Sequence, residues 1–192
     1  MNREVKTEMA CNHAYKKMQL RELLNQHGFT LIELLVTLSV ASILLSVAVP
    51  SFSTFIQNNL LTTQSNSFYS ALALAKSEAI RRSSPVTLCP STNGTSCTGG
   101  AIWSSGWLVF ADANNVGVVD AGEEILQVGA AFSGGNIFSG NMDRVTFTAN
   151  GFSMGSNGTI ILCDSRGGSH SKAIILNNQG RFRSETGTGS CG

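Results

Sequence analysis

A run of apolar residues near the N-terminus is the clearest feature of the hydrophobic pattern. From Phe29 to Val49 the chain has 21 residues, and Glu33 is the one ionisable side chain among them. At about 1.5 Å per residue a helix of this length spans roughly 30 Å, the thickness of the hydrocarbon core of a bilayer. The run therefore predicts a transmembrane helix. A carboxylate inside a membrane costs about 2.5–3.5 kcal/mol on insertion scales, which points to a functional role for Glu33.

Apolar residues at three- and four-residue spacing continue after this run and extend the predicted helix to residue 84. These positions are Phe52, Phe55, Ile56, Leu60, Phe68, Leu72, Ala75 and Ala79. Pro50 is expected to kink the helix or to loosen one turn. Arg81 and Arg82, followed by Pro85, suit a helix C-terminus. We expect residues 29–49 to form the membrane anchor and the remainder to lay an apolar stripe on a sheet.

After Pro85 the pattern changes to short runs of strand-forming residues separated by Gly, Asn and Ser. The predicted strands are Val86–Cys89, Trp107–Phe110, Ile125–Val128, Val145–Thr148, Thr159–Cys163 and Ala173–Leu176. Residues 85–192 are enough for one domain with a modest core. The predicted fold class is α+β, with a long N-terminal transmembrane helix and a small antiparallel β-rich domain packed on its C-terminal half.

The charge is distributed unevenly between the two ends of the chain. Residues 1–28 carry five basic and three acidic side chains, and this net charge of +2 is expected to stay on the cytoplasmic side. The chain after Val49 would then lie outside. Without residues 1–28 the balance is eight basic and nine acidic side chains, a net charge of −1. No global basic charge points to nucleic acid, so any such site must be local.

The segment Gly28-Phe29-Thr30-Leu31-Ile32-Glu33 closely resembles the cleavage and methylation site of type IV pilins and type II secretion pseudopilins. In that family a Pro falls 21 residues after the Phe, as Pro50 does here. The resemblance implies cleavage after Gly28 by a prepilin peptidase, N-methylation of Phe29 and retention of the apolar helix. Residues 1–28 would be the leader peptide. The alternative, a plain signal anchor, gives no reason for Glu33.

The resemblance also implies a role for Glu33 in assembly, together with Pro50. Cleavage creates an amine on Phe29, four residues before Glu33 and on the same helix face. In pilins this Glu is thought to meet the N-terminal amine of a neighbouring subunit. Translation from Met18 instead of Met1 would shorten the leader to 11 residues, and both starts remain open.

The C-terminal part resembles the GspH/FimT group of minor pilins and pseudopilins. The matching stretches are residues 75–82, 106–110, 120–126 and 180–183. This resemblance implies a non-enzymatic filament subunit without a cofactor, held by one span in the bacterial inner membrane, with its C-terminal domain periplasmic. Its partners would be the prepilin peptidase/N-methyltransferase and other major and minor pilins or pseudopilins. The choice between a type IV pilus and a type II secretion pseudopilus remains open.

Four of the five cysteines lie in the part that is predicted to be exported, where oxidising conditions favour disulfides. Cys11 lies in the predicted leader. Four cysteines allow three connectivities, of which we favour Cys89–Cys97, closing the loop between them, and Cys163–Cys191, pinning the tail to a strand. The spacings do not match paired zinc knuckles, so no metal site is expected.

The tail carries the segment Gly180-Arg181-Phe182-Arg183. In strand-type alternation Arg181 and Arg183 point to one side and Phe182 to the other. With Lys172 and Arg166 they are candidates for a small basic patch that binds phosphates regardless of sequence. In the FimT branch a Gly-Arg-x-Arg tail is linked to DNA capture during natural transformation. Alternatively, the arginines pair with Asp164 or Glu185, or face another pilin.

Two further motifs are better explained as loops. Residues 151–155 match Gly-x-Ser-x-Gly, followed by Asp164 and His170 in hydrolase order, but the flanking residues indicate a turn and not a strand–helix elbow. Asp112, Asn114, Gly117 and Glu123 fall at positions 1, 3, 6 and 12 of a calcium loop. Position 5, Val116, offers no side-chain oxygen, so an acidic hairpin loop is favoured over a calcium site.

Overall fold

The computed structural model describes residues 28–191, and the chain divides into two units, Met1–Pro50 and Ser51–Gly192. The leader before Gly28, with Cys11 and both candidate start residues, lies outside the described residues. Helix α2 (Leu31–Arg82) begins in the first unit and continues through Pro50 into the second. It begins two residues later than predicted and ends two residues earlier.

A capping box sets the start of α2. The backbone N–H of Glu33 donates to Thr30 Oγ1 at 3.2 Å, and the backbone N–H of Thr30 donates to Glu33 Oε2 at 3.4 Å. This reciprocal Thr-x-x-Glu pair satisfies two backbone donors that a helix terminus leaves free. Thr30 is therefore the N-cap, and Leu31 is the first helical residue.

In the first unit the described side chains are exposed, and the helix is long and apolar enough to cross a membrane by length and composition. Its few polar groups bond within the helix. The hydroxyls of four residues donate to the carbonyl three residues earlier: Thr37, Ser39, Ser42 and Ser46. Such internal bonding suits a segment in hydrocarbon, where water cannot satisfy polar groups.

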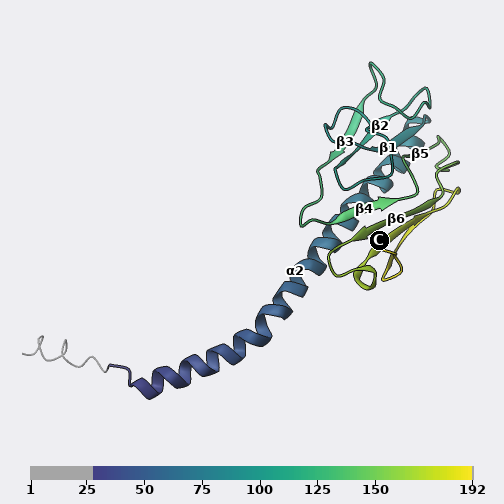
Figure 1. Ribbon diagram of the computed structural model, residues 1–192. Helices are drawn as coiled ribbons and strands as arrows, with labels where there is room; N and C mark the ends of the chain where they lie inside the picture. The colour runs from purple at the N-terminus through teal and green to yellow at the C-terminus, as the bar shows by residue number, and fades with distance from the viewer. Residues whose placement is uncertain (1–27, 192) are drawn as a thin grey trace, which may run out of the picture. The chain divides into compact units, whose positions relative to one another are not determined.

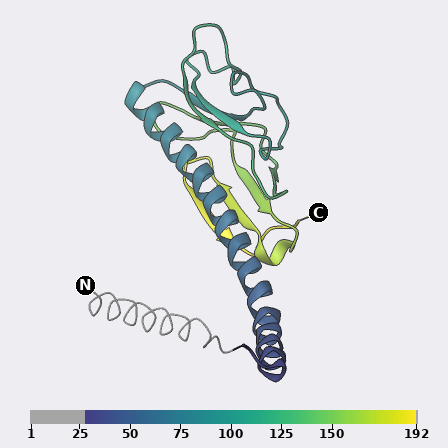
Figure 2. The ribbon, with the colours of Figure 1, turned by 90° about the vertical axis from the view of Figure 1, so that its left-hand side faces the viewer.

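The second unit contains two antiparallel sheets beside the C-terminal part of α2 (Figures 1 and 2). The first has the order β3-β2-β1-β5, formed by β1 (Val86–Pro90), β2 (Trp107–Ala111), β3 (Ile125–Gly129) and β5 (Val145–Phe147). The second has the order β4-β6-β7-β8, formed by β4 (Ile137–Gly140), β6 (Gly158–Cys163), β7 (Lys172–Leu176) and β8 (Phe182–Thr186). A short 3-10 helix, η1 (Gly168–His170), precedes β7.

All six strands expected from the sequence are present, and one end of each differs from the prediction by one residue. β4 and β8 are additional. Both are four- or five-residue segments at the edges of the second sheet, rich in Ser, Gly, Glu or Arg, and their own residues carry little strand signal. Pairing of β4 with β6 and of β8 with β7 stabilises the strand conformation that their own residues favour only weakly.

The C-terminal part of the apolar stripe predicted on α2 forms the centre of the core. Phe68, Leu72, Ala75 and Ala79 are buried as expected, and Leu61 and Ala71 join them. The predicted positions nearest Pro50, Phe52, Phe55 and Ile56, are exposed. Phe68 meets Trp103, Trp107 and Phe138 edge-on, with ring centroids 5.1, 6.1 and 4.8 Å away. Alanines on the same face leave room for the sheets to approach the helix closely.

Candidate functional site

The N-terminal candidate site consists of Phe29, Thr30 and Glu33. Phe29 is 79% exposed, and Glu33 is exposed among apolar side chains. The capping box holds the Glu33 carboxylate against the backbone of Thr30, one residue from the nitrogen that cleavage after Gly28 would free. A carboxylate fixed there can accept a hydrogen bond from an amine. The capping role of Thr30 was not predicted, although the Thr-x-x-Glu spacing is the sequence signature of a capping box.

Pro50 lies inside α2, four residues after Ser46. A proline nitrogen carries no hydrogen, so it cannot donate the usual backbone bond to the Ser46 carbonyl. The helix nevertheless continues on both sides of this position.

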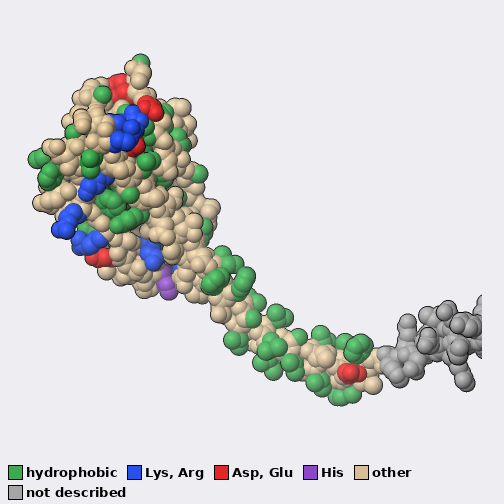
Figure 3. All heavy atoms as spheres, turned by 180° about the vertical axis from the view of Figure 1, so that it is seen from behind, with side chains coloured by type: hydrophobic (Ala, Val, Ile, Leu, Met, Phe, Trp, Pro, Cys, Tyr) green, Lys and Arg blue, Asp and Glu red, His purple; other side chains and the backbone are tan. Residues whose placement is uncertain are grey.

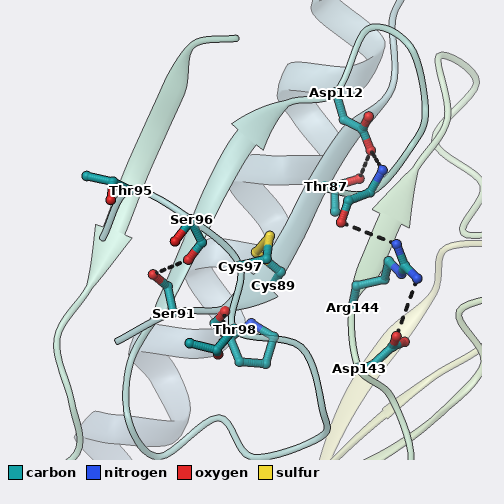
Figure 4. The surroundings of a disulfide bond; sticks show 12 residues. Thr87, Cys89, Ser91, Thr95, Ser96, Cys97, Thr98, Asp112, Asp143 and Arg144 are labelled. Carbon is teal, nitrogen blue, oxygen red and sulfur yellow. Dashed lines mark hydrogen bonds and ion pairs between the residues drawn. A yellow bond between two sulfur atoms is a disulfide. The ribbon is translucent and has the colours of Figure 1, made fainter. Parts of the chain in front are cut away.

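Both disulfides have the connectivity favoured from the sequence, Cys89–Cys97 and Cys163–Cys191. Figure 4 shows the first, which joins β1 to the following loop. Hydroxyl groups complete that loop: Ser91 Oγ donates to the Ser96 carbonyl at 2.7 Å, and Thr98 Oγ1 donates to the Pro90 carbonyl at 3.1 Å. The second disulfide attaches the tail to the end of β6.

Within β8, Phe182 and Arg183 follow the predicted alternation, whereas Arg181 precedes the strand. In the β7–β8 register Phe182 lies opposite Leu176, and Arg183 lies opposite Ile175. The ring of Phe182 packs edge-on against Tyr69 at 4.7 Å, so it faces the helix, and Arg183 faces the other way. Arg183 Nε donates to Glu185 Oε1 at 2.8 Å, the ion pair of the alternative hypothesis.

Gly180, the first residue of that tail motif, has a structural explanation. Its φ is +69°, and a Cβ at this position would lie 2.0 Å from the Gly151 carbonyl oxygen. A side chain would therefore be strained by the backbone and blocked by the neighbouring turn. The glycine in the motif allows the β7–β8 turn to pack closely.

The structure does not bring the four candidate phosphate-binding cations into one patch. Lys172 lies opposite Thr186 and on the same sheet face as buried Ile174, whereas Arg183 is on the other face. Figure 3 shows the Lys and Arg side chains of one face in separate groups. Arg183 pairs with Ile175, three positions along β7 from Lys172, and residues three apart in a strand lie on opposite faces. The sequence alone did not fix this register.

Arg166 is engaged within the domain. It forms an ion pair with Asp164, whose side chain is only 4% exposed, and its Nη1 donates to Asn58 Oδ1 at 2.8 Å. Burial of the Asp164 carboxyl raises its pKa, but the hydrogen bonds from the side chain and the backbone N–H of Arg166 outweigh burial. The pKa of Asp164 therefore lies below its ordinary value, and the pair stays charged at neutral pH.

The two loop motifs have structural roles. Asp112 is buried, and its carboxylate accepts hydrogen bonds from Thr87 Oγ1 at 2.6 Å and from the N–H groups of Val116 and Gly117. Ser153 is buried too, and its hydroxyl donates to the Asn177 carbonyl at 2.6 Å. Among residues 28–191 no three His, Cys, Asp or Glu side chains are grouped closely enough to hold a metal ion.

An ion cluster joins the end of α2 to the loop before β3. Glu78 accepts hydrogen bonds from Arg81 and Arg82, and Arg82 Nη1 also reaches Glu124 Oε2 at 2.7 Å. The hydrogen bonds from Arg81 and then Arg82 lower the pKa of Glu78 to about 2. The sequence showed these arginines as helix-terminal cations and gave no sign of the contact with Glu124.

Known protein families match both parts of the chain. The family model described as type II transport protein GspH matches residues 64–180, and that of the prokaryotic N-terminal methylation motif matches residues 23–49. The pilin-like protein PilA1 of Thermus thermophilus is 30% identical over 177 residues, covering 84% of this chain and 100% of that protein.

Among solved structures, two crystal forms of the type IV minor pilin FimU of Pseudomonas aeruginosa match with TM-scores of 0.54 and 0.52. They are 19% and 18% identical to this chain and cover 71% and 68% of it, and 96% and 97% of their own chains. At this identity the likeness shows the fold alone, a pilin fold with one long helix and antiparallel sheets.

Proposed function

The chain belongs to the type II transport protein GspH family and is a type IV minor pilin or pseudopilin, and we propose that it enters a filament through α2. Cleavage after Gly28 would free the amine of Phe29. In the filament, the Glu33 carboxylate of one subunit would pair with the Phe29 amine of its neighbour. The subunit would first be held in the inner membrane by residues 29–49, with its sheets in the periplasm.

One observation carries this proposal: an exposed apolar helix surface that contains a single carboxylate. The large apolar side chains from Phe29 to Val49 are more than half exposed, and Glu33 lies among them. An unpaired carboxylate is costly in such surroundings. A cationic partner from a neighbouring subunit offsets that cost and fixes the axial position of the helices, because the pairing is possible at one register only.

The test is Glu33→Gln in the full chain, expressed in cells that assemble the filament. We expect normal membrane insertion and cleavage, read from the mass of the new N-terminus, and at least a tenfold loss of the subunit from sheared filaments. Ser39→Ala, on the same helix, is the matched control and should be incorporated normally. Incorporation of Glu33→Gln at the level of the original chain contradicts the proposal.

A second function, DNA binding through the tail, rests on the exposed arginines. Arg181, just before β8, and Arg183, within it, are both exposed, so two guanidinium groups are free to reach phosphates. The ion pair between Arg183 and Glu185 reduces the charge that is available. The separation from Lys172 limits the footprint, so binding would be weak and sensitive to salt.

This second function is tested by comparing two double variants of the full chain in a gel shift over a salt series. Arg181→Gln/Arg183→Gln removes both candidate contacts, and Arg81→Gln/Arg144→Gln makes the same change in charge elsewhere. We expect the first pair to lower the slope of log affinity against log salt by about 1 to 2. Equal DNA binding by both variants contradicts a site at the tail.

A further inference from the structure

The outer edge of β8 is open. β8 is the last strand of the second sheet, and within residues 28–191 no strand pairs with its outer side. Two other sheet edges are covered by loops. Trp103 N–H donates to the Phe138 carbonyl of β4 at 2.7 Å. Thr146 N–H of β5 donates to Ser156 Oγ at 3.2 Å. An open edge presents unpaired N–H and C=O groups with which an extended chain can pair.

The β7–β8 ladder shows which backbone groups of β8 face outward. At its end Gly187 N–H donates to the Ser171 carbonyl at 2.9 Å, and the register of the two strands places these residues directly opposite each other. Bonded and non-bonded pairs alternate along an antiparallel ladder. The backbone N–H and C=O groups of Phe182, Ser184 and Thr186 therefore point away from β7.

Helix α2 occupies part of this edge. Tyr69 Oη donates to the Phe182 carbonyl at 3.3 Å, which agrees with the outward direction of that carbonyl. Ser184 and Thr186 lie beyond this contact and are exposed. The open part of the edge is therefore at these two residues, toward the end of β8.

The open edge is held in place from behind. Gly189 N–H donates to Ser171 Oγ at 2.9 Å, and the disulfide Cys163–Cys191 attaches the tail to the end of β6. A strand edge fixed in this way needs little ordering when an extended chain binds to it.

A pocket of about 320 Å³ lies at the open edge, within the unit Ser51–Gly192. Its lining comes from four elements: Asn58, Leu61 and Thr62 of α2, Ser169 and His170 of η1, Lys172 of β7 and Thr186 of β8. In Figure 2 the yellow strands of this sheet lie beside α2. Thr186 is four residues after Phe182, so both side chains lie on the face of β8 that is turned toward α2. The pocket therefore lies between α2 and the helix-facing side of β8.

The pocket lining suits a carboxylate. Lys172 Nζ donates to Thr186 Oγ1 at 3.0 Å and has further hydrogens to offer. None of the residues that line the pocket is acidic. Asp164, which interacts with His170, is already bound by Arg166. An ammonium group with hydroxyl groups around it makes charge-assisted hydrogen bonds to an acidic side chain.

From these observations we propose that the open edge of β8 binds an extended segment of a partner protein, with an acidic side chain of that segment beside Lys172. The backbone of the segment would pair with Ser184 and Thr186. In a paired strand the residue opposite Thr186 projects to the same sheet face as Thr186, which brings its side chain to the pocket. Main-chain pairing would supply affinity, and the pocket would supply specificity.

Two features favour a peptide over the other anions that a lysine can attract. The N–H and C=O groups of Ser184 and Thr186 match the alternating acceptors and donors of a peptide backbone, which nucleic acids lack. The attraction is also local, since the chain after Gly28 has a net charge of −1 and does not attract acidic partners as a whole. The proposal is independent of membrane anchoring and of the pairing of Glu33.

The probe is the peptide Thr-Val-Glu-Val-Thr, acetylated and amidated at its ends, with the corresponding Gln peptide as its neutral match. Binding to the full chain in detergent is followed by nuclear magnetic resonance of the Ser184 and Thr186 amides. We expect slower exchange of these two N–H groups with deuterium at saturation, and about fivefold tighter binding of the Glu peptide. Lys172→Gln should lose this preference. Arg183→Gln makes the same change in charge on the opposite face of the sheet and should keep it.

Two N-methylated peptides test the strand pairing itself. Alternate N–H groups of a paired strand face its neighbour. Methylation of the Glu nitrogen and methylation of the preceding Val nitrogen should therefore differ: one should abolish the slower exchange, and the other should retain it.

Several outcomes would overturn the proposal. Unchanged exchange at Ser184 and Thr186, or equal effects of the two N-methylated peptides, contradicts strand pairing. Equal affinity for the Glu and Gln peptides, or a preference that survives Lys172→Gln, contradicts the acidic side chain in the pocket. Equal losses in Lys172→Gln and Arg183→Gln indicate general charge attraction. Slower exchange caused by a DNA oligonucleotide, or by a higher concentration of the chain alone, assigns the edge to nucleic acid or to a second copy.

Discussion

Replacing Phe68 by Ala tests whether the second half of α2 is part of the domain core. Phe68 is fully buried, and its ring meets Trp103, Trp107 and Phe138 edge-on. Truncation of a buried Phe costs about 3–5 kcal/mol of unfolding free energy. The three aromatic contacts, each worth about 0.5–1.5 kcal/mol beyond burial, place Phe68→Ala near the upper end, at about 4–5 kcal/mol.

The assay is thermal unfolding of the full chain in detergent, followed by near-ultraviolet circular dichroism from the buried tryptophans. At about 2–4 °C per kcal/mol for a unit of this size, the expected fall in Tm is roughly 10–20 °C. Phe52→Ala, at a 66% exposed position on the same helix, is the control and should shift Tm by less than about 2 °C. A fall below about 4 °C for Phe68→Ala would refute the idea that helix and sheets share one core.

Two further predictions concern the ends of the domain. Cys163→Ser/Cys191→Ser removes a cross-link between residues 28 apart, and the chain-entropy relation gives a loss of about 3–4 kcal/mol of unfolding free energy. We expect a lower midpoint of urea unfolding. An unchanged midpoint would contradict a stabilising role for the attached tail. The pKa of Glu78 is lowered from 4.5 to about 2 in the folded protein, so its stabilising effect is present above pH 4.5 and lost as the pH falls toward 2. Glu78→Gln should therefore flatten the fall in Tm over this pH window, and a parallel fall in both proteins would argue against the ion cluster.

The sequence predicted those parts of the fold that depend on local pattern. The helix and six strands follow from spacing and residue type; each end of the helix differs by two residues from the prediction, and one end of each strand by one residue. The helix begins at Leu31 because Thr30 and Glu33 cap each other, and it ends at Arg82 because Ser83 adopts a φ of +52°. β4 and β8 could not be predicted from their own residues, since neighbouring strands stabilise them.

For the candidate sites too, the sequence predicted what depends on local pattern and not what depends on strand register or loop packing. Alternation alone predicted that Arg181 and Arg183 would face away from Phe182, because strand geometry requires it. It could not show that Lys172 lies on the opposite face of the sheet or that Arg166 binds Asp164, since both depend on register and on loop packing. The pocket at Asn58 and Lys172 joins segments more than 100 residues apart, a distance that no local pattern spans.

The sequence by itself was enough to predict the first part of α2. The cleavage motif, the length of the apolar run and its single carboxylate are all features of one continuous segment. The tertiary structure decided what the domain presents to its surroundings. In a two-faced sheet a shift of one residue moves each side chain to the other face, and packing against α2 selects one register. Whether a cation faces the helix, a carboxylate or solvent therefore depends on how the sheets pack against α2 in the core that contains Phe68.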